Sequence, residues 1–527
     1  MFASLLLAVT IVAHEPGYTT SLSRHLGRWL AEEQVAASVV TPAEMSAALR
    51  HEKIAFLVGF NEPTAAELAT LADFRARGGK LVVFHSASPA LGRMMGVKPL
   101  GYTTAATPGR WSAMKFDVAA LAGCPQTLRQ TSTVLQRIEP VRGRGKVLAV
   151  WLDRAGRATG DAAWVATDAG WWMSHVLLAD GDEHEKARLV AAMCGAVDPK
   201  LWNAVQSIAR SRKRHADTMK IATALKPAPG EIHAVWDHSG CGLYPGDWPR
   251  TMRLLKEMGV TDLFVNFAGA GFAHYPSAVL PRSKTFEQEG DQIAACLRAA
   301  AGAGVRVHAW ILCFNATRST PARLDDFARR GWRLKGRDGR LSEYLDPSCP
   351  DVRNLILAAI DELQRLYPAL AGIHLDFVRW YEGADRPPNL AAVISDFVTA
   401  VRARVKRPRW LTAAVLGKYP QCIASVGQDW ESWLNTRSVD YVVPMDYTEA
   451  NDKFESFLKQ HASSPARASR IIVGIGVTAN ESRLDATAVM TQILLTRKYK
   501  LAGNALFDLD AQLEKWILPY LRMGLWR

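Results

Sequence analysis

The sequence is poor in cysteine, and the cysteines it has are far apart. Seven of its 527 residues are cysteines, and no two of them form a Cys-x-x-Cys pair. An odd number of scattered cysteines argues against a disulfide framework and against a structural zinc site. We therefore expect single buried thiols, of which Cys296 and Cys313 lie in apolar core-like patterns.

Long hydrophobic runs and nucleic-acid-binding motifs are also missing. No stretch reaches the roughly 20 apolar residues that span a bilayer, so no integral membrane segment is predicted. The formal net charge of +13 favours anionic partners. No nucleic-acid motif accompanies that charge, and the densest basic run, residues 210–215, fits the solvated face of a helix. We therefore expect no nucleic-acid partner, and the sequence gives no signal for the oligomeric state.

An apolar run opens the chain, over residues 2–13. It has the length of a signal peptide but lacks the basic start and the small-residue cleavage site of one. Its second half also fits a first strand. We expect a periplasmic or secreted protein, with a cytoplasmic location as the alternative.

The first 200 residues alternate between strand-like and helix-like segments, as α/β domains with a parallel sheet do. Strands are expected at residues 5–12, 37–40, 54–58, 80–84, 147–152, 163–167 and 171–179, and helices at 22–33, 65–77 and 183–193. We predict a flavodoxin-like accessory domain over residues 1–200. A helical linker follows over 201–230, and a Pro- and Gly-containing segment ends it.

Eight further apolar strand candidates alternate with helical patterns from residue 231 onward. They are residues 233–236, 262–267, 305–312, 372–377, 410–416, 441–445, 471–475 and 504–507. Eight strand–helix units in roughly 300 residues are typical of a (β/α)8 barrel. The predicted fold class is therefore α/β, with a C-terminal TIM barrel over 231–527.

The segment 372–380, Gly-Ile-His-Leu-Asp-Phe-Val-Arg-Trp, is the first candidate for chemistry. Alternation puts Ile373, Leu375 and Phe377 on the helix side and His374 and Asp376 inside the barrel. An inward residue at the carboxyl end of a barrel strand reaches the face where active sites lie. Asp376 is thus predicted to be catalytic. The alternative is that it caps the next helix or pairs with Arg379.

A second strand ends in Val442-Val443-Pro444-Met445-Asp446-Tyr447. Asp446 shares the parity of Val442 and Pro444, and we expect it to converge with Asp376 inside the barrel. Glycoside hydrolysis uses two such carboxyl groups. A hydrogen bond from His374 would keep Asp376 ionised as nucleophile or charge stabiliser, and the apolar neighbours of Asp446 suit a general acid. The alternative for Asp446 is a loop carboxylate bound by backbone amides.

Other strand ends carry side chains that suit a sugar, whose hydroxyls bind polar groups and whose C–H faces stack on aromatic rings. Trp380 is expected in a loop outside the core. No two histidines have the spacing of metal ligands, so neither a metal nor another cofactor is predicted. The predicted substrate-binding residues are Trp236, Asp237, Asn266, His308, Trp310, Asn315, His374, Arg379, Trp380, Tyr381, Tyr447 and Asp508.

The order of motifs in residues 232–381 resembles bacterial glycosyl-hydrolase-like proteins of the family 10 glycosidase-like group. The motifs are Ala-Val-Trp-Asp at 234–237, His-Tyr-Pro-Ser at 274–277, Leu-Pro-Arg-Ser at 280–283, Val-His-Ala-Trp at 307–310, Tyr-Leu-Asp-Pro at 344–347, Pro-Asp-Val-Arg at 350–353 and Gly-Ile-His-Leu-Asp at 372–376. The resemblance implies a TIM barrel with glycosidase-like activity, and some of its members act on cell-wall glycans. That pattern often has a second acid after Asp376, where this chain has Phe377.

Residues 68–88 resemble the glutamine-amidotransferase-like domains that accompany some bacterial glycosidases. A working amidotransferase has a cysteine after the strand, where this chain has His85 and Ser86. The resemblance therefore implies an accessory domain rather than an amidotransferase.

Together these features predict a glycoside hydrolase that cleaves O-glycosidic bonds of a poly- or oligosaccharide, with cell-wall glycan as one substrate class. The alternative is a catalytically silent carbohydrate-binding or scaffolding protein on the same barrel, because a fold alone does not fix an activity.

Overall fold

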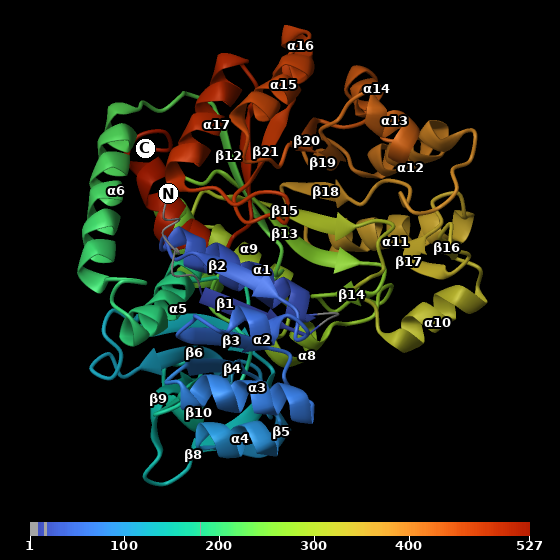
Figure 1. The fold of residues 1–527 in the computed structure, drawn as a ribbon. Coiled ribbons are helices and arrows are strands. Elements are labelled where there is room, and N and C mark those ends of the chain that lie inside the picture. Colours follow the sequence, from blue (N-terminus) through green and yellow to red (C-terminus); the bar gives the residue numbers. More distant parts are fainter. Residues whose placement is uncertain (1–8, 15–17, 180) are drawn as a thin grey trace. The chain divides into compact units, whose positions relative to one another are not determined.

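The computed structural model describes residues 9–14, 18–179 and 181–527, and it divides into two compact units, Met1–His215 and Ala216–Arg527 (Figure 1). Helix α6 (Ala204–Ala224) crosses that division within the stretch predicted to be a helical linker. Within the described residues, no helix has both the length and the hydropathy needed to span a membrane. Of the apolar run at the start, residues 2–8 lie outside the described residues, and the rest contributes to strand β1 (Val9–Ala13).

The first unit is built on a nine-stranded mixed sheet. Its order is β2-β1-β3-β4-β11-β10-β9-β6-β7. The pairings among the first five strands of this order, from β2 across to β11, are parallel, and the pairings from β11 across to β7 are antiparallel. The α/β class is confirmed, but the sheet is not wholly parallel. The strands besides β1 are β2 (Ala37–Val40), β3 (Ile54–Val58), β4 (Lys80–Phe84), β6 (Trp111–Phe116), β7 (Thr127–Ser132), β9 (Gly145–Leu152), β10 (Ala158–Thr167) and β11 (Gly170–Met173).

Helices cover both faces of this sheet. Alternate residues of its parallel strands are therefore buried in two separate cores, one on each face. Phe56 and Phe84 belong to the core under helices α1 and α5, whereas Leu57 and Val83 belong to the core under α3 and α4. A two-stranded sheet of β5 and β8 lies beside them. The bounds are α1 (Tyr18–Glu32), α2 (Met45–Ala48), α3 (Ala65–Ala76), α4 (Pro89–Met95), α5 (Glu183–Val197), β5 (Val97–Thr104) and β8 (Val134–Pro140).

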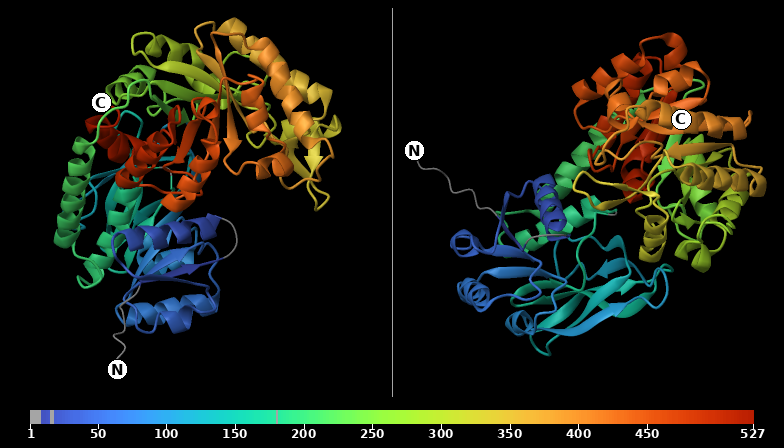
Figure 2. Two further views of the ribbon diagram at one scale, coloured as in Figure 1. Left: turned by 90° about the horizontal axis from the view of Figure 1, so that it is seen from above. Right: turned by 90° about the vertical axis from the view of Figure 1, so that its right-hand side faces the viewer.

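The second unit is a closed barrel of eight parallel strands, since the first strand pairs with both the second and the last. All eight predicted strands are present within one or two residues of their expected ends. Figure 2 shows the helices of this unit, green to red, around the outside of the strands. The barrel strands are β12 (Ile232–Asp237), β13 (Asp262–Gly269), β15 (Arg306–Leu312), β18 (Gly372–Asp376), β19 (Trp410–Leu416), β20 (Tyr441–Met445), β21 (Ile472–Gly476) and β22 (Gly503–Phe507).

The segments between the barrel strands are mostly helical. Several helices begin at a residue that accepts a hydrogen bond from the first turn, such as Asp247, Asp291 and Asp485. The helices are α7 (Trp248–Glu257), α8 (Lys284–Glu289), α9 (Gln292–Ala300), α10 (Pro321–Arg329), α11 (Pro350–Leu366), α12 (Leu390–Arg404), α13 (Gln421–Val426), α14 (Trp430–Asn435), α15 (Asn451–His461), α16 (Pro465–Ala468), α17 (Ala486–Lys498), the π-helix η1 (Leu513–Ile517) and α18 (Leu518–Met523); the short strands are β14 (Phe272–Ala273), β16 (Arg333–Lys335) and β17 (Leu341–Leu345).

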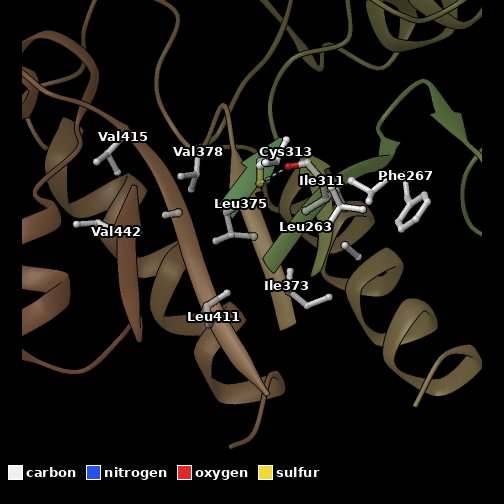
Figure 3. Packing of buried hydrophobic residues seen from close by; sticks show 14 of the residues in the cluster. Leu263, Phe267, Ile311, Cys313, Ile373, Leu375, Val378, Leu411, Val415 and Val442 are labelled. Atoms are coloured by element: carbon white, nitrogen blue, oxygen red, sulfur yellow. Dashed lines mark hydrogen bonds between the residues drawn. The ribbon is translucent and has the colours of Figure 1, made fainter. Parts of the chain in front are cut away.

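Alternate side chains of each barrel strand lie on opposite sides of the barrel wall. One set packs between strands and helices, where Figure 3 shows Ile373, Leu375 and Val442 together. The other set fills the interior and includes Trp236, Phe264, Trp310, Val443 and Ala505. This division decides which strand-end polar groups open at the carboxyl-end mouth of the barrel and which face the helices.

Candidate active site

Asp376 is the last residue of β18 and lies at the carboxyl end of the barrel. Its backbone is level with Leu312, the last residue of β15. The side chain is 6% exposed. It accepts hydrogen bonds from the indole Nε1 of Trp310 at 3.2 Å and from the backbone N of Phe377 at 2.6 Å. A nearly buried carboxyl with two N–H donors is thus positioned at the mouth of the barrel, as the sequence predicted for this residue.

The backbone turns sharply just after this carboxyl. Phe377 has a φ of 49°, a left-handed conformation that is uncommon for a residue with a side chain. The turn breaks the strand alternation: Phe377 packs against the interior core and Val378 against the helix-side core, the reverse of the prediction. Such backbone strain tends to cluster at functional sites, because the surrounding structure must hold it in place.

Burial raises the pKa of Asp376, whereas Arg379, the two N–H donors and His238 oppose that rise. His374 does not contribute the predicted hydrogen bond to this carboxyl. Its Nε2 accepts from the Trp236 indole at 3.0 Å and its Nδ1 lies 2.8 Å from the Thr412 hydroxyl. Burial also lowers the pKa of His374 well below its usual value. His374 is therefore a neutral, fully buried ring beneath the site.

Aromatic rings connect the walls of the mouth. His238 lies between Trp310 and Phe507, with centroid separations of 5.8 Å and 6.0 Å, and the Phe507 ring stacks on Tyr447 at 5.6 Å. The Tyr447 ring also meets Trp236 edge-on at 6.5 Å. Trp236 and Trp310 are almost fully buried and form the floor, whereas His238 is exposed and Tyr447 partly exposed.

A pair of carboxyl groups follows the last barrel strand. The Thr478 hydroxyl donates to Asp508 at 2.8 Å, and the backbone N of Leu513 donates to Asp510 at 2.8 Å. Burial and the neighbouring Asp508 raise the pKa of Asp510 to about 7. Burial likewise raises the pKa of Asp508. Because the charge of Asp508 disfavours ionisation of Asp510, Asp510 is partly protonated near neutral pH.

Tyr447 links this pair electrostatically to Asp376. Burial raises the pKa of its phenol well above the usual value, and Asp376 and Asp508 raise it further. The carboxyl groups of Asp376 and Asp508 therefore both lie close enough to the partly exposed Tyr447 phenol to affect its pKa. The combination offers a proton donor, a hydrogen-bonded carboxylate and ring surfaces in one place.

Asp446 lies on the other side of the barrel wall. Its parity partner Val442 belongs to the helix-side core, whereas Val443 belongs to the interior. Its carboxyl is 2.8 Å from Nε2 of His461 on α15, and both side chains have no exposed surface. The prediction that Asp446 shares the inner face with Asp376 is therefore wrong, because the inward parity of this strand belongs to Val443, Met445 and Tyr447.

His308 lies too low in the barrel to reach the mouth. It is level with Gly372, the first residue of β18, and so four residues below Asp376 along the neighbouring strand. Its Nε2 is 2.8 Å from Asp262, and neither side chain is exposed. This pair belongs to the buried lower layer of the barrel, which does not support the predicted sugar contact.

Three residues that were predicted to bind sugar make hydrogen bonds to the backbone of the protein instead. Asp237 accepts hydrogen bonds from the backbone N atoms of Ser239 at 3.0 Å and Gly242 at 2.7 Å, and it is 0% exposed. Asn315 accepts from the backbone N of Thr317 at 2.8 Å. Asn266, also fully buried, directs its Nδ2 at the backbone O of His238 at 3.5 Å, whereas its Oδ1 has no partner among the described residues. These side chains stabilise the loops that form the mouth of the barrel.

The residues after Asp376 divide between core and rim. Trp380 is 6% exposed, packs in the helix-side core and donates to the backbone O of Asp385 at 3.0 Å. The expectation that it lies outside the core is wrong. The Tyr381 ring stacks on Tyr344 at 4.3 Å, and both rings are partly exposed. The Arg379 guanidinium lies over the Phe377 ring at 4.4 Å.

Sequence reasoning missed three members of the mouth, namely His238, Thr478 and Phe507. Each lies at a strand end or within two residues after one, a signal too general to single them out. Among the described residues, no group of three or more His, Cys, Asp or Glu side chains could hold a metal ion.

Comparison with known proteins finds likeness in structure alone. No protein-family model and no curated protein matches the chain. The glycoside hydrolase domain of PgaB (BpsB) from Bordetella bronchiseptica is 16% identical, with a TM-score of 0.41 over 56% of this chain and 99% of that one. The catalytic domain of a beta-amylase from Paenibacillus polymyxa is 11% identical, with a TM-score of 0.39 over 54% of this chain and 93% of that one. An endo-1,4-beta-mannanase from Rhizomucor miehei has the same identity and TM-score over 54% of this chain and 87% of that one. Likeness at this level carries no argument about activity.

Proposed function

We propose that the protein is a glycoside hydrolase that cleaves O-glycosidic bonds of a poly- or oligosaccharide at the mouth of the barrel. The observation that carries the proposal is the Asp376 carboxyl, nearly buried at a strand end and hydrogen-bonded by Trp310 and Phe377. Ring faces and carboxyl groups together suit a sugar, which presents both C–H faces and hydroxyls.

The roles follow from the hydrogen bonds and the protons. Asp376 accepts hydrogen bonds from two N–H groups and has Arg379 nearby. It therefore either attacks the anomeric carbon as a nucleophile or stabilises the positive charge of an oxocarbenium-like transition state. The general acid must carry a proton near neutral pH, which the raised pKa values of Asp508 and Asp510 favour. We assign proton delivery to Asp508, because it directly follows β22 and its carboxyl is held by the Thr478 hydroxyl. Asp446 is too deeply enclosed beside His461 to meet the leaving group.

The test is release of reducing ends from a glycan panel that includes neutral oligosaccharides and purified peptidoglycan strands. We expect turnover of at least one substrate by the wild-type protein and none by Asp376→Asn. Asp385→Asn is the matched control, since it removes an equal charge from a side chain that is 96% exposed in the same loop. Binding without turnover by the wild type, across the panel and over a broad pH range, would instead identify a carbohydrate-binding protein.

A further inference from the structure

The first unit contains a cavity of about 530 Å³. Ligand sites for small molecules have volumes of roughly 300 to 1,000 Å³. Its walls come from the start of α4 after β4 and from the two-stranded sheet of β5 and β8, so the cavity opens beside the carboxyl end of a parallel strand. Ligands of open α/β sheets bind at such ends.

A polar side chain within the cavity wall lacks a partner. Gln136 on β8 lines the cavity and is 4% exposed. Its backbone N donates to the backbone O of Ser174, whereas no hydrogen bond of its side-chain amide is seen among the described residues. The amide is not one of the fully enclosed polar atoms without a partner, so it remains open to the cavity. An amide that borders a cavity can satisfy both its donor and its acceptor with a ligand hydroxyl or carbonyl.

An aromatic ring flanks the same opening. Tyr102 on β5 lines the cavity and is 61% exposed. Its ring meets His85 edge-on at 5.8 Å, and His85, directly after β4, has a φ of 46°. Burial lowers the pKa of His85 to about 4, so this histidine is neutral at physiological pH and supports Tyr102 without adding charge. The remaining wall is mostly Pro, Val and Gly, which suits the C–H face of a sugar ring.

The rim of the cavity is positively charged. Arg93 and Lys98 line it, and both are exposed. The Arg144 guanidinium donates hydrogen bonds to the backbone O atoms of Arg93 and Met94. These bonds place a third cation beside Arg93 and Lys98. In segments 93–102 and 136–144 the only acid is Glu139, which pairs with Lys98 at 3.2 Å. Arg93 therefore has no carboxylate partner in either segment and favours an anionic ligand.

We propose that this cavity binds a sugar unit that carries a carboxylate, such as a hexuronic acid residue of an acidic glycan. The sugar ring stacks on Tyr102, its hydroxyls bind the Gln136 amide, and its carboxylate pairs with Arg93. The first unit would then hold an acidic glycan independently of any chemistry in the barrel. This goes beyond the proposed hydrolase, because it assigns a second site and a chemical class of ligand.

The experiment is calorimetric titration of the full chain, in an Asp376→Asn background that prevents cleavage. The probes are a β-1,4-linked glucuronic acid trisaccharide and cellotriose, which differ only in the oxidation of C6. We expect the acidic probe to bind at least ten times more tightly. Arg93→Glu and Tyr102→Ala, both at exposed residues, should each weaken its binding at least tenfold, and Gln136→Leu should do the same if it folds.

Arg157→Glu is the matched control, because it reverses one exposed charge of the same unit outside the cavity lining and should leave the affinity unchanged. Equal affinity for both probes would overturn the assignment of a carboxylate ligand. No binding of either probe, or binding that Arg93→Glu and Tyr102→Ala leave unchanged, would overturn the site itself.

Discussion

Asp376 and Asp446 each lie at the carboxyl end of a strand of the same barrel, but their side chains lie on opposite sides of its wall. Asp376 is bonded by Trp310 and the next backbone N, and it retains 6% exposure at the mouth. Asp446 is paired with His461 and has no exposed side-chain surface. The comparison shows that a carboxylate at a strand end is a candidate for catalysis only when its parity directs it away from the helices.

The surroundings of Asp446 explain why it stays enclosed. A Cβ built on Gly417 would lie 1.8 Å from its Oδ1, so only glycine leaves room for this carboxyl. Within the described residues that Oδ1 has no hydrogen-bond partner, and neither has Nδ1 of His461. The pair is a buried structural contact. It matters for stability mainly because removing one partner leaves the other buried and unpaired, which lowers the free energy of unfolding.

Asp376→Asn should produce the largest effect, on activity. We expect kcat on every glycan substrate to fall by about a thousandfold or more, because the charge that meets the transition state is lost. The melting temperature should fall only modestly, since the single oxygen of the amide can accept from Trp310 or from the backbone N of Phe377 but not from both. Initial rates and melting curves on one preparation measure both. Wild-type rates in this variant would place the chemistry elsewhere.

Asp446→Ala should reverse that pattern and reduce stability instead. Loss of one member of a buried pair costs about 3 to 5 kcal/mol of unfolding free energy. Below its melting temperature the variant should keep kcat within a few-fold of wild type. Denaturant unfolding and steady-state kinetics give the two values. A stable but inactive Asp446→Ala protein would contradict the division between the two aspartates and restore Asp446 as the acid.

Trp380→Ala extends the comparison to aromatic residues. Trp380 is packed in the helix-side core, so its truncation should cost about 3 kcal/mol of stability. Tyr447→Ala, at a partly exposed ring of the mouth, should raise KM more than it lowers the melting temperature. Melting curves and KM values for the two variants test the contrast. Equal stability losses would remove the distinction between core and mouth.

Asp510→Asn should give the smallest but most specific effect, on pH dependence. The pKa of Asp510 is raised from 3.8 to about 7, so folding takes up a proton between these values. The resulting stability is present below about pH 4 and is lost as the pH rises through about 7. Wild type should therefore lose more stability than the variant between pH 4 and pH 8, in melting curves across that range. Parallel curves for the two proteins would show that Asp510 titrates normally.

The same variant tests the proton donor in the mechanism. If the Asp508–Asp510 pair supplies the proton, the alkaline limb of kcat/KM should lie near pH 7 in wild type and shift in Asp510→Asn. Asp508→Asn should lower rates most on substrates with poor leaving groups and least on activated aryl glycosides. An unchanged alkaline limb would separate the pair from catalysis without affecting the assignment of Asp376.

Apolar patterning was enough to predict the barrel strands. Strands such as β15 and β21 are buried over nearly their whole length, so their residues are mainly apolar and they stand out between helical segments. Strands β6 and β7 of the first unit were missed, because residues of mixed burial interrupt their apolar pattern. In the same half of the sheet the segments 147–152, 163–167 and 171–179 were predicted as strands, and they correspond to β9, β10 and β11, although β11 ends at Met173.

The sequence by itself determined the eight-stranded barrel, the α/β class and the position of Asp376 at a strand end, because local periodicity and chain order encode them. Only the tertiary structure decided which face of β20 is inward and that His374 bonds Trp236 and Thr412. Each of these depends on contacts between residues distant in sequence. A strand's alternation shows that two faces exist, but only the packing of its neighbours fixes which face meets the helices.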